Sequence, residues 1–257
     1  MLRNTFLHLP RIGETTEQNL WKQGIRTWDD FLQATDVPGV GTKKKHLFDQ
    51  QLKQATQELQ NNNSSYFTQL PSIQHWRTWE DFKGKAAFID IETNYQNDIT
   101  VLGVSDGERV WQFIRHHNMN PEEIKEVLHQ FKILVTFNGA CFDLPIINNC
   151  FKQAIPDVPH IDLRFAGARA GLTGGLKKIE QEIGISRGEE LEGVSGADAL
   201  VLWSQYRKTG DEQFKDILLE YNAEDVLNLK PLAQLIYDRL KRAHEKTINN
   251  TPPVLTP

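Results

Sequence analysis

The stretch that decides the fold is Phe88-Ile89-Asp90-Ile91-Glu92-Thr93-Asn94, which places two carboxylates two positions apart in an apolar, β-forming run. Residues i and i+2 of a strand point to the same face, so Asp90 and Glu92 are expected to project together, opposite Ile89 and Ile91. Two acids that face one way in a buried strand repel each other unless a cation lies between them. The stretch by itself leaves two interpretations open, a metal site or a solvated strand end that carries acids.

Composition places the chain among soluble globular proteins. With 257 residues, 39% of them hydrophobic and 25% charged, it is long enough for one large domain or one and a half ordinary ones. It has no apolar run of membrane-spanning length, and its first residues lack the layout of a signal peptide, so we expect a cytoplasmic protein without a membrane partner. The net charge of -5 argues against a generally basic nucleic-acid binder but does not exclude a nuclease. Cys141 and Cys150 lack the paired spacing of a zinc site and are expected to be reduced, packed thiols.

Residues 1–60 predict a small helical region. Two glycine turns, Arg11-Ile12-Gly13 and Val37-Pro38-Gly39-Val40-Gly41, each precede a polar helix start. The second turn, followed by Thr42-Lys43-Lys44-Lys45, resembles a helix-hairpin-helix element, in which backbone N–H groups hold a nucleic-acid phosphate. A plain turn beside a solvated lysine face fits the same residues. The polar segment 61–75 predicts a linker, and residues 246–257 predict a disordered tail.

From Ala86 onward the pattern changes to strands and then to strands alternating with helices. Strands over 86–91, 100–105 and 109–114 are expected to form an antiparallel meander. There follow a helix over 121–131, a buried strand over 133–137, a helix over 142–152, a strand near 160–163 and helices through most of 176–243. This order predicts an α/β domain over residues 76–245, with one mixed sheet flanked by helices.

Two further segments carry acids in positions that suit a shared site. Asp143 lies where a buried strand meets a helix start, so it either coordinates a cation or only stabilises the helix N-terminus. Tyr221 and Asp225 lie four residues apart in a helix expected over about 211–229, which brings them to one face. A tyrosine and an aspartate at this spacing are also a common surface pair.

Taken together, the motifs are more specific than their parts: DxE in a first strand, NxxxFDxP after a later strand and YxxxD in a late helix. In this order they resemble the DEDD superfamily of 3′-to-5′ exonucleases, which have a ribonuclease H-like fold, in the subtype whose last motif carries tyrosine. The motifs are similar to those of the proofreading domains of family B DNA polymerases. The chain is closer still to bacterial and archaeal proteins with a stand-alone ribonuclease H-like domain. They share the segment Leu172-Thr173-Gly174-Gly175-Leu176-Lys177-Lys178-Ile179-Glu180, and the resemblance covers about 86–240.

The resemblance implies four metal-binding carboxylates, on Asp90, Glu92, Asp143 and Asp225, and places Tyr221 where the family's water-orienting tyrosine stands. These five residues are the expected catalytic set, with Asp90 as the ligand that bridges two ions. Oxygen ligands suit Mg²⁺ and Mn²⁺, whereas zinc would favour a cluster of cysteine and histidine. The expected cofactor is therefore a pair of Mg²⁺ or Mn²⁺ ions that hydrolyse a phosphodiester by a two-metal mechanism.

The expected substrate is single-stranded DNA or RNA, both of which stay open. Residues expected to contact it are Thr93, Asn138, Phe142, Lys177 and Lys178. The two lysines follow a Gly174-Gly175 turn that can present N–H groups to a phosphate, although acids interleave with the bases there and a solvated mixed-charge face fits as well. The predicted function is a metal-dependent 3′-to-5′ exonuclease. The alternatives are a ribonuclease H-like endonuclease and a non-catalytic nucleic-acid-binding protein that keeps the fold.

Overall fold

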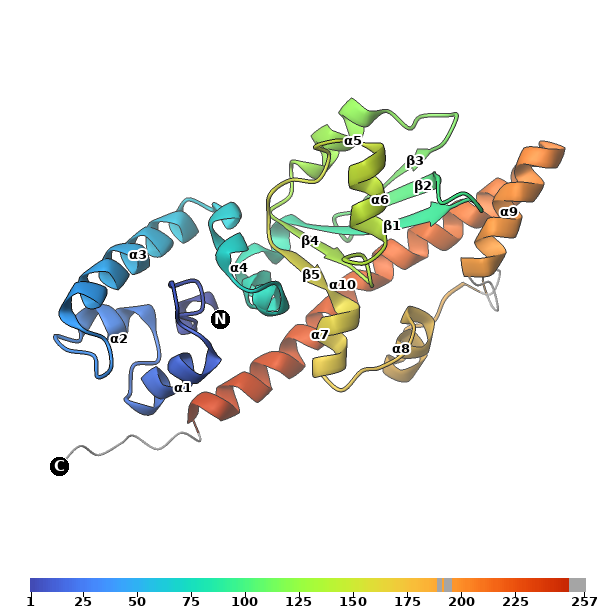
Figure 1. Cartoon of the computed structure of the whole chain (residues 1–257). Helices are drawn as coiled ribbons and strands as arrows, with labels where there is room; N and C mark the ends of the chain where they lie inside the picture. The colour runs from blue at the N-terminus through green and yellow to red at the C-terminus, as the bar shows by residue number, and fades with distance from the viewer. Residues whose placement is uncertain (189–190, 192–195, 250–257) are drawn as a thin grey trace.

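The computed structural model describes residues 1–188, 191 and 196–249, and its centre is a five-stranded sheet of order β3-β2-β1-β4-β5 (Figure 1). The strands are β1 Ala86–Thr93, β2 Ile99–Ser105, β3 Val110–Ile114, β4 Ile133–Thr136 and β5 His160–Asp162. Strands β1, β2 and β3 pair antiparallel, whereas β4 and β5 run parallel to β1. The predicted α/β class with a mixed sheet and an antiparallel meander is confirmed.

Helices cover both faces of this sheet (Figure 1). Helices α5 and α6 pack on one face through Ile124, Leu128 and Ile147, and the long helix α10 packs on the other through Val226 and Leu229. The helices after the first strand are α5 Pro121–Leu128, α6 Asp143–Cys150, α7 Leu163–Arg169, α8 Leu176–Ile183, α9 Gly196–Thr209 and α10 Glu212–Asn249.

Strand β1 divides its side chains between these two layers as its alternating pattern predicts. Ala87, Ile89 and Ile91 join the core beneath α5 and α6, while Ala86 and Phe88 join the core beneath α10. Asp90 and Glu92 continue the row of Phe88. The two acids therefore face α10, which is the helix that carries Tyr221 and Asp225.

The N-terminal region is helical, as predicted, and shares its core with the sheet. Leu2, Phe6 and Trp28 are buried in the same apolar cluster as Phe88 and Val226. The elements that precede the first strand are η1 Leu2–Asn4, α1 Glu14–Lys22, α2 Trp28–Gln33, α3 Thr42–Gln60, η2 Ser64–Gln69, η3 Ser72–Thr78, α4 Trp79–Phe82 and η4 Lys83–Lys85. The N-terminal helices and the sheet therefore form one continuous body.

The expectation of a linker over 61–75 is wrong. The segment contains η2 and the first part of η3, and it buries Phe67 and Leu70 completely or nearly so. Most of its polar residues face solvent, but Ser64, Gln74 and His75 are buried with the two apolar side chains, so the segment is anchored in the core at both ends. A polar composition alone therefore did not distinguish a linker from a packed connection.

Helix α10 is longer than the helix expected over about 211–229, because it runs without a break through Pro231 and ends at Asn249, past the helical stretch expected to about 243. Pro231 costs one backbone hydrogen bond, but Leu232, Ile236 and Leu240 continue the buried face and stabilise the helix beyond it. With 38 residues the helix is about 57 Å long and reaches from the sheet to α1 (Figure 1). The predicted tail over 246–257 is thus helical to Asn249, and the rest of it lies outside the described residues.

The turn between α2 and α3 is tight, with Val37 and Val40 bridged and Gly39 at φ +84°. Lys45 is not part of a basic surface, since its ammonium group lies 2.6 Å from Asp49 and packs over Phe31. Binding of a nucleic-acid phosphate by this turn stays a prediction.

Both cysteines are free, as expected, but they are exposed and not packed, because α6 presents Cys150 and its preceding turn presents Cys141 to solvent. No helix in the described part of the chain combines the length and the apolarity that crossing a membrane requires.

Candidate metal centre

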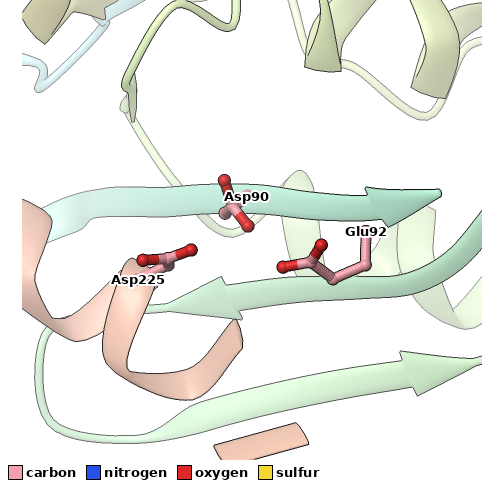
Figure 2. Close-up of side chains that lie close together, drawn as sticks. All are labelled: Asp90, Glu92 and Asp225. Atoms are coloured by element: carbon pink, nitrogen blue, oxygen red, sulfur yellow. The ribbon is translucent and has the colours of Figure 1, made fainter. Parts of the chain in front are cut away.

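Three acids from two elements meet above the sheet. Asp90 and Glu92 come from β1 and Asp225 comes from α10, and each offers a carboxylate oxygen within 4.8 Å of the other two (Figure 2). Glu92 and Asp225 are buried, and Asp90 is partly buried. Such a cluster of oxygen donors matches the preference of hard divalent cations for carboxylates.

Asp143 lies at the edge of this cluster. It is the first residue of α6, it is buried, and one carboxylate oxygen accepts a hydrogen bond of 3.1 Å from the Ile91 N–H. The side chain therefore joins α6 to β1 in the same cavity as the three other acids. Of the two interpretations left open by the sequence, a simple helix-end charge fits less well, because the acid is directed to the neighbouring strand.

The surroundings of the four acids raise their pKa values, and a bound cation would lower these pKa values again. Burial, followed by repulsion from neighbouring acids, raises the pKa of Asp90 and of Glu92 well above the ordinary range. Burial also raises the pKa of Asp143 to about 7, against the hydrogen bond from Ile91. The pKa of Asp225 rises to about 6, since burial outweighs the nearby Arg187. Buried like charges of this kind are stabilised when cations bind between them, so the residues fit a divalent metal centre.

Asn222 fixes the orientation of Asp90. The residue is fully buried, and its side-chain N–H₂ group lies 3.2 Å from one Asp90 carboxylate oxygen, while its oxygen accepts a hydrogen bond of 3.2 Å from Gln112. Asp90, Gly103 and Gln112 are opposite one another on β1, β2 and β3, and Asn222 lies across the middle position. The amide contact with Gln112 determines which end of Asn222 faces the acid.

Gly103 provides the space for this contact, which gives a testable prediction. A Cβ atom at this position would lie 2.2 Å from the Asn222 side-chain oxygen. Gly103→Ala is expected to displace Asn222, to lower the free energy of unfolding by about 1–3 kcal/mol and to weaken binding of Mn²⁺. Thermal unfolding and Mn²⁺ titration measure both effects. Gly84→Ala is the matched control, since a Cβ there meets no atom within 4 Å, and equal behaviour of the two variants would contradict the prediction.

Two cations lie beside the acids, over the ring of Tyr221. The Lys177 ammonium is 4.5 Å and the Arg187 guanidinium 5.4 Å from the ring centroid. Arg187 also donates two hydrogen bonds of 2.8 Å to Glu180, and its Nη2 is 2.5 Å from an Asp225 oxygen. The guanidinium therefore offsets part of the negative charge of the cluster and supports Asp225 from the side of α8.

A cavity of about 470 Å³ opens above the acids and collects most of the residues that the sequence singles out. All five residues of the expected catalytic set line it, as do the expected substrate residues Thr93, Asn138 and Phe142. The two expected substrate lysines lie in different surroundings. Lys177 lies over the ring of Tyr221, while Lys178 is exposed and its side chain lies beside Gly174. Of the pair, only Lys177 is therefore close to the acids.

Several residues of the site could not be predicted from a sequence motif. Asn222 and Gln112 act on Asp90 from positions far away in the chain, and Arg187, which belongs to none of the three motifs, is paired with Asp225. Tyr95 lines the cavity with 67% of its side chain exposed, in the turn after β1. The only sequence signal for Asn222 is that it follows Tyr221 directly, inside the YxxxD motif.

A family model for the RNase H superfamily matches residues 87–237. The chain belongs to the RNase H superfamily. The match covers all five strands and most of α10, and so contains every acid of the cluster. Searches of curated proteins and of solved structures gave no match. Membership of the superfamily suggests a nuclease that acts on nucleic acid with divalent metals, and the acidic cluster is consistent with such ions.

Proposed function

We propose that the chain is a metal-dependent 3′-to-5′ exonuclease of the DEDD type, tyrosine subtype, acting on single-stranded nucleic acid. The observation that carries the proposal is the meeting of Asp90, Glu92 and Asp225 beneath one cavity, with Asp143 and Tyr221 in its wall. Those are the acids and the tyrosine of the three motifs. Membership of the RNase H superfamily supports the reaction class, phosphodiester hydrolysis.

Four carboxylates in one cavity suit two Mg²⁺ or Mn²⁺ ions, which when bound supply a nucleophilic water and neutralise charge on the phosphate. Asp90, Glu92, Asp143 and Asp225 would hold these ions. Asn222 keeps one oxygen of Asp90 hydrogen-bonded, so the carboxylate has a defined orientation. Phe142 and Tyr95 are 39% and 67% exposed at the cavity, where their rings are available to stack on the terminal base.

Tyr221 is proposed to hold the attacking water through its hydroxyl. Burial and the nearby Asp225 raise the pKa of the phenol above its ordinary value, so it stays protonated and acts as a neutral hydrogen-bond partner. Tyr221→Phe is expected to lower kcat about 100-fold while leaving metal affinity unchanged. Single-turnover rates and Mn²⁺ titration test this. A rate within twofold of wild type would contradict the role.

The function as a whole is tested by digesting 5′-labelled single-stranded DNA and RNA with Mg²⁺ or Mn²⁺, and with a chelator as control. A ladder of products that shortens by one nucleotide at a time, and only with metal, is the expected result. A circular single strand distinguishes the alternative, because an endonuclease cleaves it and an exonuclease leaves it intact. The same experiment compares DNA with RNA.

A further inference from the structure

A second cavity, of about 320 Å³, opens beside the metal centre at the end of β5. Its lining is mainly apolar and includes Ile73, Trp76, Ala140, Phe165 and Ala166. Strands β1, β4 and β5 are parallel, so their carboxyl ends, where both cavities open, lie at one edge of the sheet. Two strand spacings separate β1 from β5, which is about 10 Å.

One loop forms a wall of both cavities. Asn138 and Phe142 line the metal cavity, and Ala140, between them, lines the second one. Asp162 holds this loop through hydrogen bonds of 2.9 Å from the Asn138 N–H and 3.0 Å from the Ala140 N–H, and it also accepts one from the Arg164 N–H. Asp162, which also lines the second cavity, is therefore paired with three backbone donors.

The rim of the second cavity combines exposed apolar groups with cations. Ile73 and Phe165 are 55% and 48% exposed, which is unusual for side chains of this size. Arg169 lies one helical turn after Phe165 and donates to the Ile73 carbonyl at 2.6 Å, and Arg164 donates to the Asn138 side-chain oxygen at 2.8 Å. Within the described residues the guanidinium groups of both arginines donate to neutral oxygens, and neither guanidinium forms a salt bridge with a carboxylate.

We propose that this second cavity is a subsite for an unpaired nucleobase upstream of the bond that is cut. The inference rests on the proposed exonuclease function. Phe165 stacks on the base, and Arg164 and Arg169 contact the phosphates on its two sides. An aromatic face between cations suits single-stranded nucleic acid of any sequence, because every base offers a π-face and every nucleotide a charge. Arg164, which bridges α7 to Asn138, marks the path from this subsite to the metal cavity.

The test compares the affinity of Phe165→Ala for short and long oligonucleotides in the presence of chelator, so that no cleavage occurs. Fluorescence anisotropy of a labelled dinucleotide and a labelled octanucleotide is the readout. The substitution is expected to weaken binding of the octanucleotide about tenfold and to leave the dinucleotide, which fills the metal cavity alone, unchanged. Phe165→Trp should retain octanucleotide binding, because the aromatic face is kept. Leu47→Ala, which removes an exposed apolar side chain of α3, should bind both oligonucleotides like wild type.

Arg169→Ala adds a second measurement. Loss of one phosphate contact is expected to reduce the slope of log affinity against log salt by about 0.7 for the octanucleotide only. Unchanged octanucleotide affinity in Phe165→Ala, together with normal digestion by wild type, overturns the subsite and leaves the proposed function standing. Failure of the wild-type protein to bind or digest any single strand overturns both. Weakened binding of both lengths also overturns the subsite, since it places Phe165 in the metal cavity.

Discussion

Asp90→Asn is expected to abolish hydrolysis and, at the same time, to make the metal-free protein more stable. One of the residues that would hold the metal ions would lose its charge, so the rate should fall at least about 1,000-fold. The same charge is costly in the absence of metal, because burial and three neighbouring acids raise the pKa of Asp90. Removing it should raise the free energy of unfolding in chelator, because the folded state then no longer holds a buried acid that its neighbours repel.

The amide keeps the shape of the carboxylate and its acceptor for Asn222, so the fold is preserved. Thermal unfolding in chelator should show a higher melting temperature for Asp90→Asn than for wild type. Asp106→Asn is the control: this acid lies in the turn between β2 and β3, where backbone N–H groups bind its carboxylate and no metal ligand is near. It should leave the rate unchanged without raising stability. Retained activity or a lower melting temperature in Asp90→Asn would refute the assignment.

The fold could be predicted from the sequence where the spacing of apolar and polar residues matches the repeat of a strand or a helix. In β1 the period of two places apolar residues on one face and the two acids on the other, and Ile89 and Ile91 are buried while Asp90 and Glu92 face α10. The four-residue spacing of Tyr221 and Asp225 likewise predicts that they share one face of a helix, and both side chains line the cavity. Local patterns of this kind depend only on the geometry of one strand or helix.

Features that depend on tertiary packing could not be predicted in the same way. Phe67 and Leu70 turn an apparently polar segment into a packed connection, and the buried residues after Pro231 carry α10 past a residue that ends most helices. The pairing of Asn222 with Asp90 links residues 132 positions apart, and a small residue at Gly103 is the condition that permits it. A single sequence holds no signal for such contacts.

Stabilisation of the protein by a divalent metal is expected to increase steeply with pH between about 5.5 and 8. An acid with a raised folded-state pKa stabilises the metal-free protein at low pH, and this contribution is lost as the pH rises through the folded value, about 6 for Asp225 and about 7 for Asp143. Metal binding has the opposite dependence, because the ion binds the deprotonated carboxylates. For each proton that the ion displaces, its affinity is expected to rise about tenfold per pH unit.

The difference in melting temperature with Mn²⁺ and with chelator, taken at each pH, isolates this effect. Buried histidines such as His8, whose pKa burial lowers to about 4, change stability in both samples alike and cancel in the difference. The difference should be small at pH 5.5 and grow toward pH 8, and Asp90→Asn should reduce both its size and its slope. A difference that stays constant over this range would mean that the buried acids do not bind the ion, because ligands that must lose protons cannot bind metal independently of pH.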